Sequence, residues 1–324
     1  MPCENTPVLA ILFITFPFFA LVLCGYVAAR RGLLPQAAIP GLNSFVLYFA
    51  LPCMLYRFGA TTPIAQLLDA SVFGVYLLCA LVMVGFTVTM TLSQRIDWNN
   101  AAFGALVAAF PNTGFMGVPL LVALLGSAAA GPAIVTIVVD LVVTSSLCIA
   151  LSRLDAADKH GAGVALKNAL RGVATNPMPW AIVCGALTSA LGLAPVKPVM
   201  QTLGMLADAA SPVALFTIGA VLARSQMNSV DATPLAEYVP VALKKLVLHP
   251  LLVLLLGTAA RSLGIPLSKF ALTVMVLVAA LPSASNVSLL AEKFGANNGR
   301  IARIILVSTA LAFLTFSGAV ALLH

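Results

Sequence analysis

Charged side chains are scarce in this 324-residue chain: Asp, Glu, Lys and Arg together make up 8% of it, against about a quarter in an average soluble domain. Hydrophobic residues make up 61%, and the mean hydropathy is +1.07. This composition predicts a polytopic membrane protein. The net charge of +7 does not indicate a nucleic-acid partner, because the basic residues lie at the ends of apolar stretches, where they set topology.

Signatures of catalysis and of metal binding are also lacking. The chain has three histidines that do not cluster, and it contains no HExxH, GxSxG or phosphate-binding loop. Its six cysteines show no CxxC spacing, and all but Cys3 fall inside apolar stretches, which indicates small buried side chains. Glu4 is the only early charge, so no cleaved signal peptide is expected. We predict neither an enzyme nor a cofactor.

Ten apolar stretches are long enough to cross a bilayer, which takes about 20 residues. They cover residues 7–29, 38–58, 70–93, 99–124, 131–152, 172–192, 201–223, 238–260, 268–292 and 300–323. Residues 153–171 form the one sizeable hydrophilic loop. The sequence therefore predicts an all-α protein of ten transmembrane helices, with a first five-helix unit (1–152), a loop (153–171) and a second five-helix unit (172–324).

The basic residues predict the orientation of these spans. With the N-terminus outside, the cytoplasmic ends carry Arg30, Arg31, Arg95, Arg153, Lys159, Lys167, Arg171, Arg224, Lys293, Arg300 and Arg303, and the outer ends carry Arg57, Lys197, Arg261 and Lys269. Cytoplasmic segments of membrane proteins carry an excess of Lys and Arg. We therefore expect a multi-pass protein of the cell (inner) membrane with both termini extracytoplasmic.

The chain repeats itself at an offset of 160 residues. Residues 17–60 hold eight prolines and glycines, and six of them recur as the same residue type. Pro17, Gly25, Gly32, Pro35, Pro52 and Gly59 recur as Pro177, Gly185, Gly192, Pro195, Pro212 and Gly219. Each unit has five spans, an odd number, so the second copy crosses the membrane upside down. The pattern predicts an inverted-topology repeat.

Two prolines interrupt apolar spans at matching positions, each preceded by the same tetrapeptide, Leu-Val-Ala-Ala, which begins at Leu106 and at Leu277. Proline breaks or kinks a helix, and a broken helix presents free N–H groups that attract an anion. Matching breaks in two halves of a chain indicate a transporter's substrate site. The predicted site residues are Pro111, Asn112, Thr113, Gly114, Pro282, Ser283, Ser285 and Asn286. The alternative is that both prolines only kink helices for packing, which the shared tetrapeptide disfavours.

Ionisable residues inside spans are costly and therefore candidates for function. Asp140 lies in the middle of the fifth span, and Asp208 lies early in the seventh. Lys245 and His249 are four residues apart in the eighth span and share one helix face. The sequence leaves two interpretations open. Lys245 forms a structural ion pair with Asp140 or Asp208, or these groups balance the charge of a substrate anion or carry a coupling proton.

Four motifs can be compared with known families: Leu51-Pro52, the segment Pro111-Asn112-Thr113-Gly114-Phe115-Met116-Gly117-Val118-Pro119, the Pro282 break with Asn286, and Val307-Ser308-Thr309. Together they resemble the auxin efflux carrier family, especially its short bacterial members of the malonate-transporter type. The resemblance covers essentially the whole chain. It implies a scaffold of spans one, two, six and seven, a transport domain of the other six, elevator-like movement and a homodimer. The family's crossover site maps onto Pro111, Asn112, Pro282 and Asn286.

We therefore expect a permease that moves a small organic anion, a mono- or dicarboxylate such as malonate or malate, with H⁺ or Na⁺ as coupling ion. Asn112, Ser283, Ser285 and Asn286 would bind the anion, and Asp140, Lys245 and Asp208 would balance charge or carry the proton. In the first break Asn112 directly follows the proline, whereas in the second break Ser283 follows Pro282 and the first asparagine is Asn286, four residues after it. Either Ser283 or Asn286 therefore corresponds to Asn112. Alternatives are a sodium-coupled symporter of the bile-acid type and a membrane sensor that transports nothing.

Overall fold

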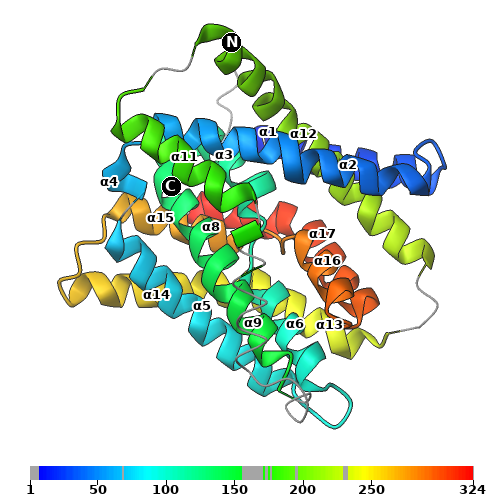
Figure 1. The fold of residues 1–324 in the computed structure, drawn as a ribbon. Coiled ribbons are helices and arrows are strands. Elements are labelled where there is room, and N and C mark those ends of the chain that lie inside the picture. The colour runs from blue at the N-terminus through cyan, green and yellow to red at the C-terminus, as the bar shows by residue number, and fades with distance from the viewer. Residues whose placement is uncertain are drawn as a thin grey trace, which may run out of the picture.

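In the computed structural model the chain folds into α-helices joined by short 3₁₀ and π turns (Figure 1). The structure describes residues 7–67, 69–154, 171, 174–175, 177–193, 196–228 and 233–323. Within these ranges no β-strand forms, and the only extended pairings are two isolated β-bridges. The prediction of an all-α polytopic protein is confirmed for this part of the chain. Most of the predicted loop 153–171 lies outside the described residues.

The first half of the chain forms helices as far as residue 151. In order they are α1 (Pro7–Arg30), η1 (Gln36–Ala38), α2 (Ile39–Phe45), η2 (Val46–Ala50), α3 (Leu51–Thr61), α4 (Ile64–Leu67), α5 (Ala70–Thr91), α6 (Trp98–Ala109), η3 (Thr113–Gly117), α7 (Val118–Leu125), η4 (Ser127–Ala129), α8 (Ala130–Val138), η5 (Val139–Thr144) and α9 (Ser145–Leu151). Side chains cap two of them: Asp69 accepts hydrogen bonds from the first backbone N–H groups of α5, and Asp97 does so for α6.

The second half continues with α11 (Pro177–Ala190), α12 (Lys197–Asn228), α13 (Leu235–Leu243), η6 (Lys244–Leu248), α14 (His249–Ser262), α15 (Lys269–Ala280), α16 (Asn286–Lys293) and α17 (Asn298–Leu323). Ser268 caps α15 by accepting from the N–H of Ala271. Pro212 lies inside α12 without ending it. At both ends, α12 extends beyond the predicted span 201–223.

Seven helical stretches, counted over the described residues, are long and apolar enough to cross a membrane. They are Ile11–Arg30, Gln36–Thr61, Ala65–Thr91, Ser127–Leu151, Lys197–Met227, Leu235–Ser262 and Asn298–Leu323. Two further predicted spans are interrupted: α6 ends before Pro111 and α15 ends before Pro282, as predicted. The remaining one, 172–192, contains α11, which has 14 residues. Ten crossings thus stay a prediction.

In the part of the chain that the structure describes, four π turns interrupt the α-helical pattern, and three of them come just before a proline. η2 precedes Pro52, η3 precedes Pro119 and η6 precedes Pro250. Because proline has no N–H to donate to the carbonyl four residues earlier, the turn before it can widen. The fourth, η5, begins one residue before Asp140. Such wide turns are common at functional sites.

The helices gather in two groups. In Figure 1, α1, α2, α3, α11 and α12 lie together along the upper side, and α5, α6, α13 and α14 lie below them. The most extensive helix contacts are those of α1 with α12 and of α3 with α11. The most deeply buried helices are α6 and α15, in which Ala101–Ala109 and Val274–Ala280 are buried on every side. A helix that is apolar all round belongs in such a position.

Glycines allow the two closest helix pairs to form. A Cβ at Gly25 of α1 would collide with the carbonyl oxygen of Phe216 in α12, and a Cβ at Gly219 would collide with that of Val22. In the other pair, a Cβ at Gly185 of α11 would collide with a backbone carbonyl of α3. Small residues let helix backbones approach within a membrane. A Cβ at Gly59 of α3 would likewise come within 2.9 Å of the carbonyl oxygen of Ile182 in α11, so Gly59 and Gly219 both permit close helix packing.

A buried arginine ties three helix ends together. Arg300 is only 2% exposed. Its Nε donates to the carbonyl of Glu237 and its Nη1 to that of Asn100, each at 2.9 Å. The guanidinium lies against Gly104, where a Cβ would come within 3.2 Å of it. It thereby fixes the starts of α6, α13 and α17 against each other.

Candidate functional site: the crossing of two broken helices

The two breaks cross in the centre of the molecule and pair with each other. Pro111 and Ser283 form an isolated antiparallel β-bridge. The N–H of Asn112 donates to the carbonyl of Pro282 at 2.8 Å, and the N–H of Ala284 donates to that of Phe110 at 3.0 Å. Each break thus satisfies backbone groups that the other has freed. This is how non-helical backbone is tolerated at membrane depth.

This pairing corrects the correspondence predicted between the breaks. The tetrapeptides align Pro111 with Pro282, but the two reciprocal hydrogen bonds centre on Pro111 and Ser283. By backbone position, Ala284 is then the counterpart of Asn112. Neither Ser283 nor Asn286 takes that place. Chain geometry at the crossing, which the shared tetrapeptide does not encode, decides the register.

Several polar side-chain atoms at the crossing are buried without a hydrogen-bond partner. They are the Oδ1 atoms of Asn112 and Asn286 and the hydroxyl oxygens of Thr113 and Ser283. Asn112 is 4% exposed, Thr113 0% and Ser283 1%. An unsatisfied buried polar group costs about 1–3 kcal/mol. Four of them in one place mark a site where a ligand or water supplies the missing partners.

Two small cavities flank the crossing. The first has a volume of about 20 Å³ and is bordered by Asn112 and Asn286 from the breaks, by Leu51 and Leu55 of α3 and by Met178 of α11. Pro111 and Gly114 also line it. A cavity of this size holds about one water molecule, whereas ligand sites measure several hundred Å³. The site is therefore closed in this conformation.

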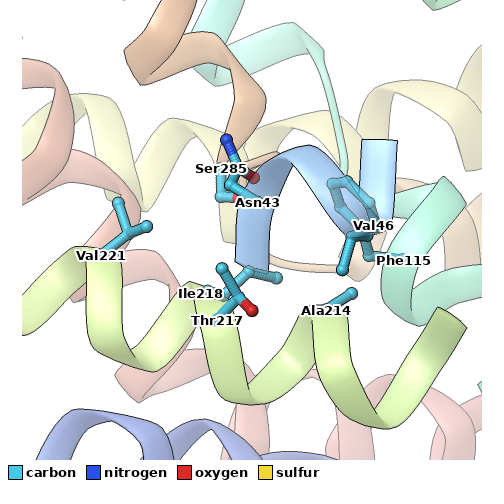
Figure 2. A pocket seen from close by; sticks show the side chains of 8 residues that line it. All are labelled: Asn43, Val46, Phe115, Ala214, Thr217, Ile218, Val221 and Ser285. Atoms are coloured by element: carbon cyan, nitrogen blue, oxygen red, sulfur yellow. The ribbon is translucent and has the colours of Figure 1, made fainter. Parts of the chain in front are cut away.

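The second cavity, of about 10 Å³, lies on the side of α12 (Figure 2). Figure 2 shows Asn43 of α2 and Ser285 facing Thr217 and its neighbours along α12. Sequence reasoning did not select Asn43 or Thr217 as site residues. An amide inside the second span was an available signal for Asn43, and Thr217 lies in the repeat motif that begins at Pro212.

The predicted site residues therefore come together, in different roles. Pro111, Asn112, Gly114 and Asn286 border the first cavity, and Ser285 borders the second. Thr113 and Ser283 are buried beside them, and Pro282 takes part in the backbone pairing. A further residue, Ser308 of α17, accepts a hydrogen bond from the N–H of Ser283 at 3.2 Å. It lies in the Val307-Ser308-Thr309 motif but was not predicted to touch the crossing.

Asp140 is completely buried and is held by hydroxyl groups. Tyr76 of α5 donates to its Oδ2 and Thr144 donates to its Oδ1, each at 3.2 Å. The π turn η5 brings Thr144 over the carboxyl group, and the hydroxyl of Ser145 donates to the Asp140 carbonyl at 2.8 Å. Tyr76 was not predicted as part of this cluster, although it is a lone tyrosine within an apolar span.

Lys245, in η6, is also completely buried, and its side chain reaches the C-terminal end of the broken helix α15. Its Nζ donates to the carbonyl of Ala279 at 2.6 Å and lies 3.2 Å from Nδ1 of His249. Carbonyl groups at the C-terminal end of a helix attract cations. The His249 ring lies 6.1 Å from that of Tyr76, so Asp140 and Lys245 belong to one buried polar cluster without forming a direct ion pair.

The predicted pairing of Asp208 with Lys245 is wrong. Asp208 forms an ion pair with Arg57 at 2.7 Å, and its side chain is 71% exposed. Ala207, Ala210 and Ala214 occupy the buried face of α12, so helical periodicity turns Asp208 outwards. Asp208 therefore does not reach the buried cluster.

The apolar helices, the crossing breaks and the buried charges define a class of protein: a polytopic membrane protein with the features of a transporter. The sequence comparisons identify the family. The sequence model of the membrane transport protein family matches residues 10–320. The chain belongs to this family, which is the auxin efflux carrier family, so the predicted family is confirmed.

Two relatives agree with this assignment. A Rhizobium meliloti (strain 1021) protein named "Putative malonate transporter" is 30% identical over 310 residues, which cover 94% of this chain and 93% of that protein. An Escherichia coli (strain K12) protein named "Uncharacterized transporter YfdV" is 28% identical over 283 residues, 86% of each chain. These relatives are transporters and not enzymes.

Proposed function

We propose that this protein is a secondary active transporter that moves a small mono- or dicarboxylate such as malonate or malate across the membrane. The observation that carries the proposal is the set of buried, unpartnered polar atoms at the crossing of the breaks. Asn112 and Asn286 can each turn an amide N–H₂ group toward a carboxylate, since an amide presents a donor and an acceptor on opposite sides. The relative from Rhizobium meliloti, named for malonate, supports this class of substrate.

Backbone groups add to the attraction for an anion. The helical segments η3–α7 and α16 both begin at the crossing, at Thr113 and Asn286. The first N–H groups of a helix have no partner within it and carry a partial positive charge. A carboxylate at the crossing would therefore meet two helix starts, and a dicarboxylate could engage both.

Alternating access follows from the size of the site. A cavity of about 20 Å³ cannot admit a dicarboxylate, so α6 and α16 must move away from α3 and α11 for a substrate to bind. The wall on the side of α3 and α11 presents the apolar side chains of Leu51, Leu55 and Met178. We propose that the helices carrying the breaks slide along this apolar wall in an elevator-like movement.

The architecture proposed for this movement has ten crossings in two inverted five-helix repeats, 1–152 and 172–324. The glycine contacts support it, because Gly25 packs on α12 near Gly219, and their repeat counterparts, Gly185 and Gly59, pack on each other's helices in the same way. We also propose an inner-membrane location with both termini outside and, as in the family, a homodimer. Labelling of single cysteines placed in the loops from each side of intact cells tests the orientation.

We propose that the coupling ion is a proton. The Lys245 ammonium already donates a hydrogen bond to a carbonyl at the broken end of α15. Carriers of this architecture hold a metal cation against carbonyl groups at such broken helix ends. Asp140, which has only hydroxyl partners, is the carboxyl group that can take up the proton. The alternative is a sodium-coupled organic-anion symporter. Uptake that survives replacement of Na⁺ by K⁺ but stops when the pH gradient is collapsed favours the proton.

Uptake of labelled malonate, malate and monocarboxylates into proteoliposomes tests the proposed function. We expect Asn112→Ala to reduce uptake at least about tenfold, the equivalent of one lost charge-assisted hydrogen bond. Asn43→Ala, outside the first cavity, should affect uptake less. Wild-type rates in Asn112→Ala would remove the crossing from the mechanism. A complete lack of flux for every anion would support a membrane sensor instead.

A further inference from the structure

A second hollow lies away from the crossing, between α1 and α17. It is an apolar groove of about 450 Å³, lined on α1 by Phe16, Phe19 and Leu23 and on α17 by Leu306, Ala310 and Phe313. A polar cavity of about 330 Å³ continues it, since Leu306 borders both. The other residues that line the polar cavity include Arg30, Gln226, Tyr238 and Arg303. The proposed transport mechanism uses neither hollow.

The two helices run antiparallel in one register, which brings both arginines to the same end. The Thr15 and Ser317 hydroxyls lie 3.4 Å apart, and the Phe19 and Phe313 rings lie 5.3 Å apart. Four residues forward along α1 thus correspond to four residues back along α17. Continued to the end of α1, this register sets Arg30 opposite the start of α17, beside Arg303. The charge predictions assign this end to the cytoplasmic side.

The dimensions of the groove fit one lipid leaflet. Phe16 and Arg30 are 14 residues apart on α1, which corresponds to about 21 Å at 1.5 Å per residue. Half of the hydrocarbon core of a bilayer measures about 15 Å. The groove therefore has room for one acyl chain, and the arginines lie where its headgroup would be.

The cationic end is held in place by its neighbours. Arg303 donates from Nη1 to the carbonyl of Thr233 at 2.9 Å, and its guanidinium lies 6.0 Å from the centre of the Tyr238 ring. The hydroxyl of Tyr26 donates to the Gln226 side chain. Arg30 is exposed at the end of α1. The cavity thus combines guanidinium, amide and hydroxyl groups, which suits a phosphate diester.

We propose that the groove and the polar cavity together bind one anionic phospholipid. Its phosphate lies between Arg30 and Arg303, and an acyl chain lies along Phe19, Leu23 and Ala310. Basic pockets between transmembrane helices at the cytoplasmic side suit such headgroups. Because α1 is the first span, in the proposed scaffold, and α17 is the tenth, in the proposed transport domain, the lipid would touch both domains and be displaced when they move.

Native mass spectrometry of the purified protein with phosphatidylglycerol and phosphatidylcholine tests the proposal. Wild-type protein should retain phosphatidylglycerol preferentially. Each of Arg30→Gln and Arg303→Gln should reduce this retention about fivefold, the value of one arginine near a lipid surface. Arg31→Gln is the matched control, because it removes the same charge from the neighbouring exposed position and should change nothing.

A second pair of variants tests the acyl-chain groove without altering charge. Ala310→Trp should fill the groove and abolish retention, whereas Leu311→Trp, on the neighbouring exposed position, should not. Equal retention in all variants, or an equal loss in Arg31→Gln, overturns the proposal. Complete displacement by inorganic phosphate would assign the cavity to a soluble anion. Dimers that retain no lipid would assign the groove to a second copy of the chain, and this result also contradicts the proposal.

Discussion

Replacement of Lys245 by methionine tests the buried charge cluster most directly. Methionine has a similar length but carries no charge and donates no hydrogen bond. The substitution removes the donor to the Ala279 carbonyl and the neighbour of the His249 ring. It also leaves Asp140 in the same buried cluster without a nearby positive charge.

The expected cost follows from these contacts. An unsatisfied buried polar group costs about 1–3 kcal/mol, and the loss of one partner of a buried charge pair costs about 3–5 kcal/mol. Because Asp140 and Lys245 are not in direct contact, we expect the lower part of this range, about 3 kcal/mol. Asp140→Asn in the same chain should restore part of the loss, since it neutralises the remaining charge, with a coupling of about 1–2 kcal/mol.

Unfolding of the purified variants in detergent, followed by temperature or denaturant, measures these values. Lys244→Met is the matched control, because the Nζ of Lys244 lies 5.5 Å from the Phe86 ring and its side chain is only half-buried. A loss of no more than about 1 kcal/mol is expected there. If Lys245→Met is as stable as Lys244→Met, or if Asp140→Asn adds its own cost in full, the two buried charges do not act together.

Three further predictions concern other contacts. Gly219→Leu should prevent α12 from packing on α1 and abolish folded protein, as judged by size-exclusion chromatography. Asp208→Asn should cost no more than about 1 kcal/mol in thermal unfolding, because its ion pair with Arg57 is exposed; a larger loss would contradict the surface assignment. Ser308→Ala should cost about 1 kcal/mol and slow uptake by removing the acceptor for the N–H of Ser283; unaltered uptake would show that this bond is dispensable.

Much of the architecture could be predicted from local sequence. Long apolar stretches can bury their backbone polar groups in lipid only as helices, so composition alone decides the class. Pro111 and Pro282 end helices because proline cannot donate the required hydrogen bond, and the structure has breaks at both. The close approach of Gly219 to α1 was also predictable, since a small residue in an apolar helix favours contact.

Long-range contacts required the tertiary structure. Asp208 and Asp140 both lie within predicted spans, yet one is on the surface with Arg57 and the other is buried under Tyr76. The direction in which each helix turns its faces depends on its neighbours, and no local pattern encodes these. The same reason explains why Asn43 was missed: it borders a cavity only because α2, α12 and the second break meet there.

By itself, the sequence determined that this is a helical membrane protein of the auxin efflux carrier family with two interrupted helices. Proline chemistry and hydrophobicity act within a few residues, so they can be read along the chain. Only the tertiary structure decided that the breaks pair through Pro111 and Ser283, and that α1 and α17 leave a groove between them with arginines at one end. Both depend on how distant helices pack, because their side chains and backbone groups find partners only in three dimensions.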